Sequence, residues 1–247
     1  FIPGISMHAR AYEYEQLYRA LHAVRSQSNH AINALKLWAP HAPTAQRAEL
    51  YTVQGYAVLQ LADFYCSGVP LSTVDFDGDI TYRSGSTTEE LYQHAIALFD
   101  SAYALRGDDV RMGHFARIGK GRAFLALGHT DSAAVAVRDV PTTFSYGVTS
   151  IRLYFQLFSA MVGDLEGETG LPFISSGDPR IRTFVSGNIS GTPRHYPATW
   201  GTNTGEPIRI VLASGIEARL AEAEADLRAG GTSWLTLLNQ LRTDGTE

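Results

Sequence analysis

Apolar residues recur at three- and four-residue spacing along much of this chain, which predicts amphipathic helices. One such stripe lies between residues 48 and 72, and its members are Leu50, Val53, Ala57, Leu61 and Phe64. Glycine costs about 1 kcal/mol relative to alanine in an exposed helix, so Gly55 within this stretch predicts a neighbouring helix at close range. Ser67 and Gly68, followed by Pro70, end the pattern. We therefore expect a buried helix that leads into a loop.

A second long stripe precedes this helix, between residues 11 and 39. Its apolar members are Tyr14, Leu17, Tyr18, Leu21, Val24, Ala31, Leu35 and Trp38. Pro40 and Pro43 separate the two segments, because proline is poorly tolerated inside a helix but fits its first turn. The two segments together predict a helical hairpin over about residues 11–66.

Two further hairpins follow from the same kind of pattern. One covers about residues 87–128, where the run Thr87-Thr88-Glu89-Glu90 predicts a helix cap, because a threonine oxygen can accept an early backbone N–H and glutamates are favourable near a helix N-terminus. The other covers about residues 212–242, and its first stripe consists of Leu212, Ile216, Leu220, Ala223 and Leu227. Paired helices with alanine and glycine where they cross are typical of tetratricopeptide-like arrays. We therefore predict an all-α fold, with three hairpins packed side by side in a single domain over residues 1–247.

Two stretches lack helical periodicity and predict irregular structure. Residues 69–86 are rich in proline, glycine and aspartate, which indicates a loop. Residues 162–207 are rich in glycine and proline, and we expect a long, loop-rich insertion that lies over the helices. Short strands or irregular core segments are expected at residues 142–147 and 151–158, where aromatic and aliphatic residues concentrate.

Three aspartates in the first of these loops, Asp75, Asp77 and Asp79, resemble part of a calcium-binding loop. The full pattern requires glycine at its sixth position and glutamate at its twelfth. Here glycine is fourth and the twelfth residue is Ser86. A solvated turn is therefore favoured, and we expect no metal and no cofactor. The only cysteine, Cys66, excludes an internal disulfide and a multi-cysteine metal centre.

Charge and composition exclude several other classes of function. The formal net charge is -5 and no run of Lys or Arg forms a stripe, so no nucleic-acid partner is expected. No apolar stretch approaches the roughly 20 residues that span a bilayer. The first residue is Phe1 and not Met, from which we expect a processed or truncated chain.

Signatures of catalysis are also missing, so we expect no enzyme and no catalytic residue. The sequence contains no GxSxG, HExxH, GxxxxGK[ST] or strand–GxGxxG–helix motif. Glu217, Glu222 and Glu224 offer carboxylates on one helix, but Arg219 and Arg228 lie beside them. This mixture is typical of a solvated ion-pair surface.

Aromatic residues in the predicted loops are the remaining candidates for a ligand site. They are Tyr82, Tyr146, Tyr196 and Trp200. Flat rings beside amides and guanidinium groups suit an oligosaccharide, because a ring stacks on the C–H face of a sugar while hydroxyls take hydrogen bonds. The alternative is that each ring plugs its loop onto the helical core.

Six sequence motifs occur in a set order along the chain. They are CSGVPLS at 66–72, TTEELYQHAIALFDSAYAL at 87–105, ARIGKGRAFLALG at 116–128, VPTTFSY at 140–146, GLPF at 170–173 with DPR at 178–180, and ASGIEARLAEAEADLRAG at 213–230. Together they resemble the RagB/SusD-like outer-membrane nutrient-uptake proteins, and the similarity extends from about residue 11 to residue 242.

This resemblance implies a lipoprotein on the extracellular face of the outer membrane that captures glycans or other nutrients for a partner TonB-dependent transporter. It also implies a signal peptide and a lipid-bearing cysteine before residue 1 and a C-terminal section after Glu247, so we expect residues 1–247 to lack both terminal regions of the family. Ligand residues vary within the family, so none is carried over.

Two other hypotheses come from different classes of protein. The helical hairpins are also consistent with a tetratricopeptide-like protein-interaction or structural subunit of an extracellular assembly, which could include self-assembly. The alternative localisation is a secreted protein without a lipid anchor. A carbohydrate-active enzyme requires two carboxylates that flank a groove. The spacing of acidic residues in this sequence does not supply such a pair.

Overall fold

The computed structural model describes residues 7–150, 183–189, 192–197 and 208–243. The chain divides into two compact units. Unit 1 comprises Phe1–Tyr14 and Gly147–Leu212, and unit 2 comprises Glu15–Tyr146 and Ala213–Glu247. All three predicted hairpins lie in unit 2, apart from the first turns of the first helix. The expectation of one domain over residues 1–247 stays a prediction.

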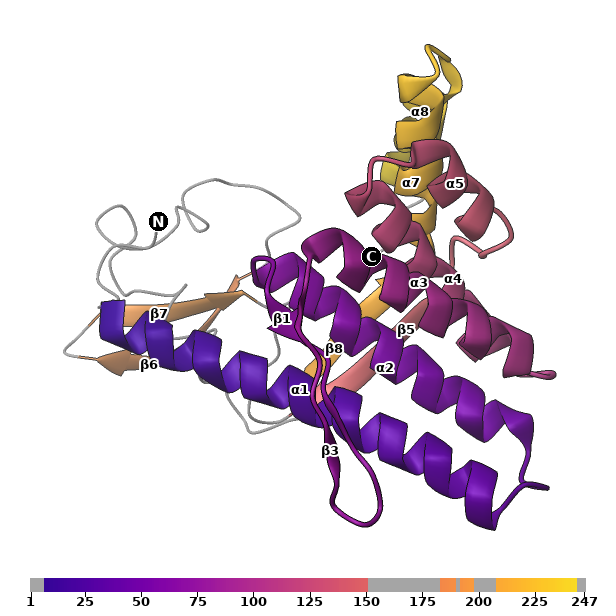
Figure 1. The fold of residues 1–247 in the computed structure, drawn as a ribbon. Helices are drawn as coiled ribbons and strands as arrows, with labels where there is room; N and C mark the ends of the chain where they lie inside the picture. Colours follow the sequence, from indigo (N-terminus) through magenta and orange to yellow (C-terminus); the bar gives the residue numbers. More distant parts are fainter. Residues whose placement is uncertain (1–6, 151–182, 190–191, 198–207, 244–247) are drawn as a thin grey trace. The chain divides into compact units, whose positions relative to one another are not determined.

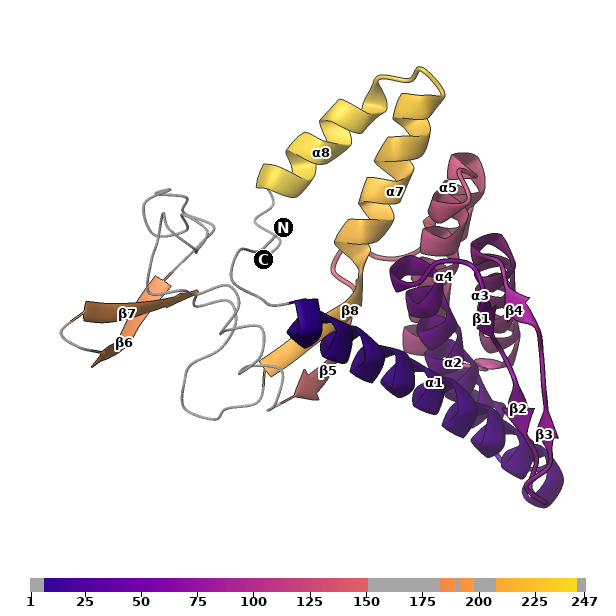
Figure 2. The same ribbon diagram turned by 60° about the vertical axis from the view of Figure 1, so that its left-hand side comes forward.

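Unit 2 is an array of helices (Figures 1 and 2). The helices are α1 (Met7–Trp38), α2 (Thr44–Phe64), α3 (Thr88–Leu105), α4 (Val110–Ala126), α5 (Thr130–Val137), α7 (Gly215–Arg228) and α8 (Ser233–Thr243). From α2 onward each helix packs on the next in this order. The predicted all-α fold of helical hairpins is confirmed.

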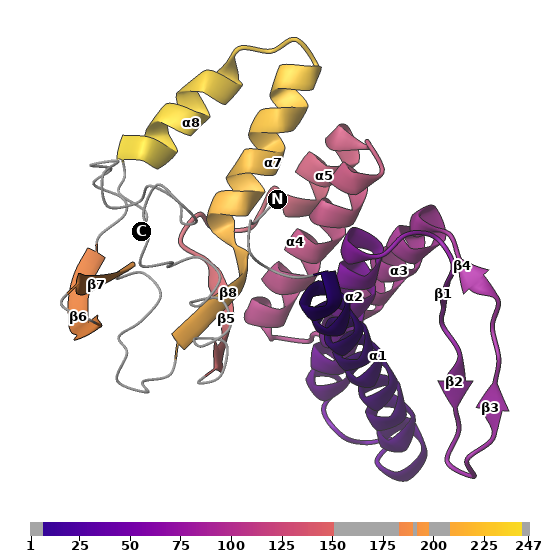
Figure 3. The same cartoon turned by 90° about the vertical axis from the view of Figure 1, so that its left-hand side faces the viewer.

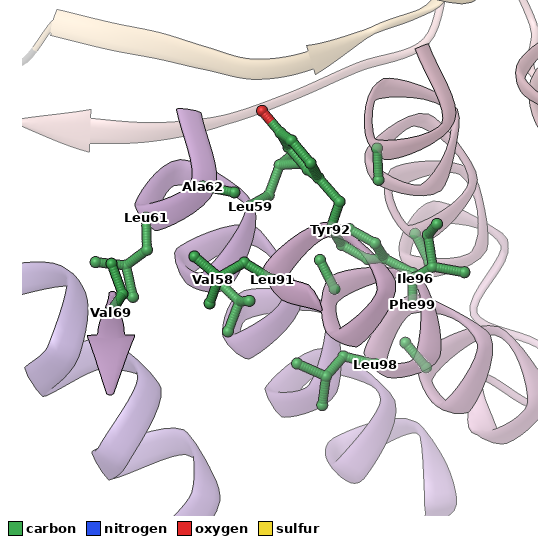
Figure 4. Close-up of a cluster of buried hydrophobic side chains, with 14 residues drawn as sticks. Val58, Leu59, Leu61, Ala62, Val69, Leu91, Tyr92, Ile96, Leu98 and Phe99 are labelled. Atoms are coloured by element: carbon green, nitrogen blue, oxygen red, sulfur yellow. The ribbon is translucent and has the colours of Figure 1, made fainter. Parts of the chain in front are cut away.

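The main hydrophobic core of unit 2 lies between α2 and α3. Figure 4 shows Val58, Leu59 and Leu91 in this core, with Leu61 beside Val69, and all five are fully or almost fully buried. Helix α2 is buried on several sides, because α3 and α4 both pack against it. The buried surface of α2 is therefore wider than the single stripe that the sequence predicts. The predicted stripe also extends too far toward the end of the helix, because Phe64 is exposed.

Small residues allow these helices to approach closely. A Cβ atom at Gly55 of α2 would lie 3.0 Å from the ring of Phe99 on α3, and one at Gly119 of α4 would overlap the same ring. Phe99 thus fills the space between α2 and α4, and two glycines make room for it. The predicted close approach at Gly55 is confirmed.

Helix α3 begins at the cap that its sequence predicts, and this cap is a capping box. The hydroxyl of Thr87 accepts from the backbone N–H of Glu90 at 3.1 Å, and the carboxylate of Glu90 accepts from the backbone N–H of Thr87 at 2.7 Å. Two of the N–H groups that a helix start leaves unpaired are satisfied in this way.

The stripes predicted for α1 and α7 differ from the observed buried faces. On α1, Val24 and Trp38 are exposed, whereas Arg25, Ser28 and Ile32 are buried. On α7 the leucines Leu220 and Leu227 are exposed, and the buried residues are Gly215, Ala218, Ala221, Ala223 and Ala225. Alanine lets α5 and α4 come close to α7, so the small side chains face the array and the large ones do not.

The predicted loop at 69–86 is an antiparallel ribbon. Strand β1 (Val69–Pro70) pairs with β4 (Gly85–Ser86), and β2 (Thr73–Val74) pairs with β3 (Ile80–Thr81). A side chain at Gly85 would overlap the backbone of Gly68, so the two segments approach closely at these glycines. Figure 3 shows the ribbon as a separate pair of strands beside the helices of unit 2. Below, residues 69–86 are called the ribbon.

Unit 1 contains strands where the sequence predicts irregular structure. Strand β6 (Thr183–Ile189) pairs antiparallel with β7 (Thr192–Pro197), which corrects part of the predicted insertion at 162–207. Strand β5 (Ser145–Ser150) and strand β8 (Ile208–Ser214) form a second pair, so one expected short strand is confirmed. Residues 151–158 and the rest of the insertion lie outside the described residues, and its position over the helices stays a prediction.

Candidate ligand-binding surface

Exposed aromatic side chains meet where the ribbon packs on α1 in unit 2. The ring centroid of Phe76 lies 4.5 Å from that of Trp38 and 5.6 Å from that of His30. Trp38 is nevertheless 66% exposed and Phe76 45% exposed. These rings therefore hold each other in place while a large part of their surface remains open. We call His30, Trp38 and Phe76 the ribbon-tip cluster.

The turn that carries Phe76 is built by the aspartates that precede and follow it. The carboxylate of Asp75 accepts from the backbone N–H of Asp77 at 3.0 Å and from that of Asp79 at 2.9 Å. Gly78 has a positive φ of 91°, a conformation that glycine adopts without strain. The motif that resembles a calcium loop is thus a hydrogen-bonded turn, and it fixes the backbone on both sides of Phe76.

Tyr82 lies on the same ribbon, directly after β3. Its side chain is 79% exposed, and Ile80 two residues earlier is also exposed. Both side chains of this part of the ribbon are therefore open to solvent. Of the four aromatic residues predicted to bind ligand, Tyr82 is thus presented to solvent.

Tyr146 has different surroundings. It lies at the start of β5, is 8% exposed, and stacks on Phe115 of α4 with ring centroids 4.3 Å apart. The guanidinium of Arg111 lies over the ring of Tyr146 at 4.5 Å from its centroid. Burial is the main reason that the pKa of the Tyr146 phenol is raised. This ring attaches its strand to the helical core, which is the alternative left open by the sequence.

The other two predicted site residues belong to unit 1. Tyr196 lies on β7, opposite Phe184 of β6 in the antiparallel register. Trp200 lies outside the described residues. The shared role of Tyr82, Tyr196 and Trp200 stays a prediction.

Trp38 and Phe76 were not among the residues that the sequence singled out for ligand binding. Helical spacing placed Trp38 in a buried stripe, and Phe76 was read as part of an acidic turn. Trp38 is the last residue of α1 and lies two residues before Pro40. This position at a helix end is the sequence feature that indicates exposure. A helix end often extends past its packing partner, so periodicity there is a weak guide to burial.

Three glutamates of α7 in unit 2 form ion pairs with arginine side chains. On α7, Glu217 pairs with Arg122 of α4, Glu222 with Arg219, and Glu224 with Arg228. Burial raises the pKa of Glu222, against the opposing effect of Arg219. The predicted ion-pair surface is confirmed for these three glutamates. Within residues 7–150, 183–189, 192–197 and 208–243, no group of three His, Cys, Asp or Glu side chains is placed to hold a metal.

A second surface feature lies between α7 and α8. A groove of about 510 Å³ runs along this hairpin and is lined by Leu220, Leu227, Trp234 and Leu238, with Glu224 and Arg228 also contributing. No residue of α8 is buried. The lining of this groove is mainly aliphatic, whereas the ribbon-tip cluster consists of aromatic rings.

Comparison with known proteins identifies the fold. No protein-family model and no curated protein sequence matches this chain. Among solved structures, the chain is similar to the SusD-like carbohydrate binding protein from Bacteroides vulgatus ATCC 8482, with a TM-score of 0.62 and 14% sequence identity. The match covers 92% of this chain, and the chain spans 60% of the length of that protein. The chain therefore has a SusD-like fold, and the resemblance seen in its sequence motifs is confirmed at the level of the fold.

None of the helices in the described part of the chain is both long and apolar enough to cross a membrane.

Proposed function

We propose that this chain is a glycan-binding subunit at the cell surface. The observation that carries the proposal is the set of exposed rings at Trp38, Phe76 and Tyr82 on a SusD-like fold. The similar solved structure is described as a carbohydrate binding protein, which supports the same ligand class here. Tyr196 and Trp200 are proposed to add further stacking surface, whereas Tyr146 serves as a packing residue.

The chemistry of the ribbon suits a neutral oligosaccharide. Aromatic rings stack against the apolar C–H faces of a sugar, and the backbone and hydroxyl groups of the ribbon can bond its hydroxyls. Asp75, Asp77 and Asp79 are exposed in the same turn, so a negatively charged sugar would be repelled there. Binding is expected to be weak, because a few stacking contacts must offset the freedom that ligand and side chains lose.

The wider role follows from the sequence resemblance. We propose that the protein works without catalysis, on the extracellular face of the outer membrane, and passes its ligand to a TonB-dependent transporter. A lipid anchor before residue 1 is part of this proposal. The resemblance to RagB/SusD-like proteins supports these four points together.

Isothermal titration calorimetry against a panel of neutral oligosaccharides tests the proposal. The variants are Phe76→Ala, Tyr82→Ala and the double change Tyr196→Ala with Trp200→Ala. Phe64→Ala is the matched control, since Phe64 is an exposed aromatic residue on α2 outside the cluster. Losing one stacked ring is expected to weaken binding by about 5–10-fold, with little effect of salt. Equal affinity in all variants would clear these rings of a role in binding.

An interaction subunit is the second candidate function, and α8 is the observation that favours it. A helix with no buried residue and an apolar groove at its side resembles the end of an array that continues. Under this hypothesis the wild-type chain self-associates and Leu235→Asp abolishes the association, as measured by sedimentation velocity. A monomeric wild type that binds glycan would favour the first proposal.

A further inference from the structure

Helix α1 buries a charged residue against the ribbon. Arg25 is 6% exposed, and its Nη2 donates to the backbone carbonyl of Ser72 at 2.6 Å. Its Nε is buried and has no hydrogen-bond partner among the residues that the structure describes. In the same described residues no salt bridge to a carboxylate involves Arg25. Burial lowers the pKa of this guanidinium, as expected for a cation removed from water.

The surroundings of Arg25 add to the cost of burying its charge. His22 lies one turn earlier on α1, and its Nε2 is also buried without a partner in the described part of the chain. Burial and, to a smaller extent, the charge of Arg25 lower the pKa of both His22 and His94. A buried charge without an opposite charge disfavours folding. Stability alone therefore does not account for Arg25, and its contact with Ser72 is the feature to explain.

Ser72 connects the two edges of the ribbon. Its carbonyl accepts from Arg25, and its hydroxyl accepts from the backbone N–H of Arg83 at 3.1 Å. Ser72 directly precedes β2, and Arg83 directly follows Tyr82. One residue thus joins α1, the strand that leads to Phe76, and the segment that carries Tyr82.

The ribbon needs such support because its own strands are short. Each of β1 to β4 has two residues, and an isolated two-stranded hairpin is at best marginally stable in water. Gly68 N–H donates to the carbonyl of Ser86 at 2.8 Å and holds the base of the ribbon. The ribbon-tip cluster holds its end. Between the base and the tip of the ribbon, Arg25 holds the ribbon to α1 through its hydrogen bond to Ser72.

We propose that Arg25 is a positioning residue for the ligand-binding surface. It sets the ribbon on α1 so that Phe76 stays against Trp38 and Tyr82 is held at a defined orientation. The effect of Arg25 on glycan affinity rests on the proposed glycan-binding function. Its effect on the position of the ribbon can be tested without a ligand. Arg25 itself does not contact the glycan in this proposal.

The test compares Arg25→Met and Arg25→Lys with wild type by amide hydrogen exchange, thermal unfolding and glycan titration. Methionine keeps much of the volume and removes the charge and the donor. We expect exchange of the Arg83 amide and its ribbon neighbours to rise about tenfold, because a hydrogen bond from a charged donor is lost. The melting temperature should stay unchanged or rise, and glycan affinity should fall about tenfold. Arg25→Lys retains a donor and should restore part of both the exchange protection and the affinity.

Two further variants keep the result interpretable. Arg19→Met is the matched control, because Arg19 lies on the same helix but is exposed and pairs with Glu15. Ser72→Ala removes only the acceptor for the Arg83 N–H and should raise exchange at Arg83 without changing the Arg25 side chain. Arg25→Lys, which keeps the charge, serves if Arg25→Met does not fold.

Three outcomes separate the hypotheses. Unchanged ribbon exchange in Arg25→Met and Ser72→Ala overturns the inference. A general rise in exchange through all helices, with a lower melting temperature, also overturns it, since Arg25 would then be a structural residue only. Faster exchange confined to the ribbon supports it, and if the wild type then binds no glycan, the positioning role stands while the proposed function fails.

Discussion

Arg122 on α4 and Glu217 on α7 lie 95 residues apart in the sequence and form a two-point ion pair in unit 2. Arg122 Nε donates to Glu217 Oε1, and Nη2 donates to Oε2 at 2.7 Å. Burial lowers the pKa of Arg122, but the hydrogen bonds and charge of Glu217 raise it overall. This pair links the second helical hairpin directly to the third.

Removing this link should destabilise unit 2 measurably. Arg122→Met is expected to lower the free energy of unfolding by about 1–3 kcal/mol, because both side chains are half-buried and the carboxylate loses two charged hydrogen bonds. Urea denaturation measures the change. Arg228→Met removes the exposed pair with Glu224 and should cost about 0.5 kcal/mol or less. A double-mutant cycle with Glu217→Gln that finds no coupling energy would contradict the role of the pair.

Space around Phe99 makes Gly119 sensitive to substitution. Gly119→Ala places a methyl group on the ring of Phe99 and should destabilise the protein by about 1–3 kcal/mol. Gly55→Ala meets the same ring at 3.0 Å and should cost less. Thermal unfolding compares the two variants, with Phe99→Leu added to each. If the smaller side chain does not reduce the cost of Gly119→Ala, the ring is not the obstacle.

Leu61 lies in the buried core, so truncating its side chain should leave a cavity and destabilise the protein. Leu61 of α2 is fully buried and lies beside the ribbon residue Val69 (Figure 4), so Leu61→Ala should cost roughly 2–5 kcal/mol. Leu37→Ala, at an exposed position on α1, should change stability by about 0.5 kcal/mol or less. Urea melts of both variants test this contrast. A Leu61→Ala protein as stable as wild type would show that the α2 core tolerates the cavity.

Acid should weaken the fold through its half-buried histidines. Burial, and then Arg25, lower the pKa of His22 below the 6.5 of a free histidine. The unfolded chain therefore binds a proton at a higher pH than the folded chain. Stability is unaffected by this group well above pH 6.5, and it falls as the pH drops through 6.5 toward the lower pKa of the folded state.

Chemical denaturation at pH 7.5 and at pH 5.5 checks this prediction. His22→Gln should reduce the difference in unfolding free energy between the two pH values. His41→Gln, in the exposed turn between α1 and α2, is the control for replacing a histidine away from α1. A wild-type protein that is more stable at the lower pH would be contrary to the expected sign.

Local sequence rules determined much of this architecture. Apolar spacing and proline placed the helices and their turns, the Thr87–Glu90 run marked the start of α3, and Gly55 marked a close helix crossing. These features depend on residues within a few positions of each other or on backbone geometry, so a linear pattern contains them. The motif order also predicted the SusD-like fold.

The candidate site was predicted only in part, and for a physical reason. Tyr82 was named from the sequence and is exposed, but Tyr146 looked the same in a linear pattern and is buried on Phe115. Trp38 was placed in the core and Phe76 in a plain turn, yet the two rings meet on the surface. Which aromatic ring is covered depends on the element packed against it, and local spacing does not specify that neighbour.

Residue spacing along the chain is thus enough to predict the helical hairpins and their small-residue crossings. Tertiary structure alone decided which face of α1 and α7 is buried, so Arg25 lies against the ribbon and Leu220 faces solvent. A helix with apolar residues on more than one side has several faces that could pack, and the neighbours brought by the rest of the chain select one of them.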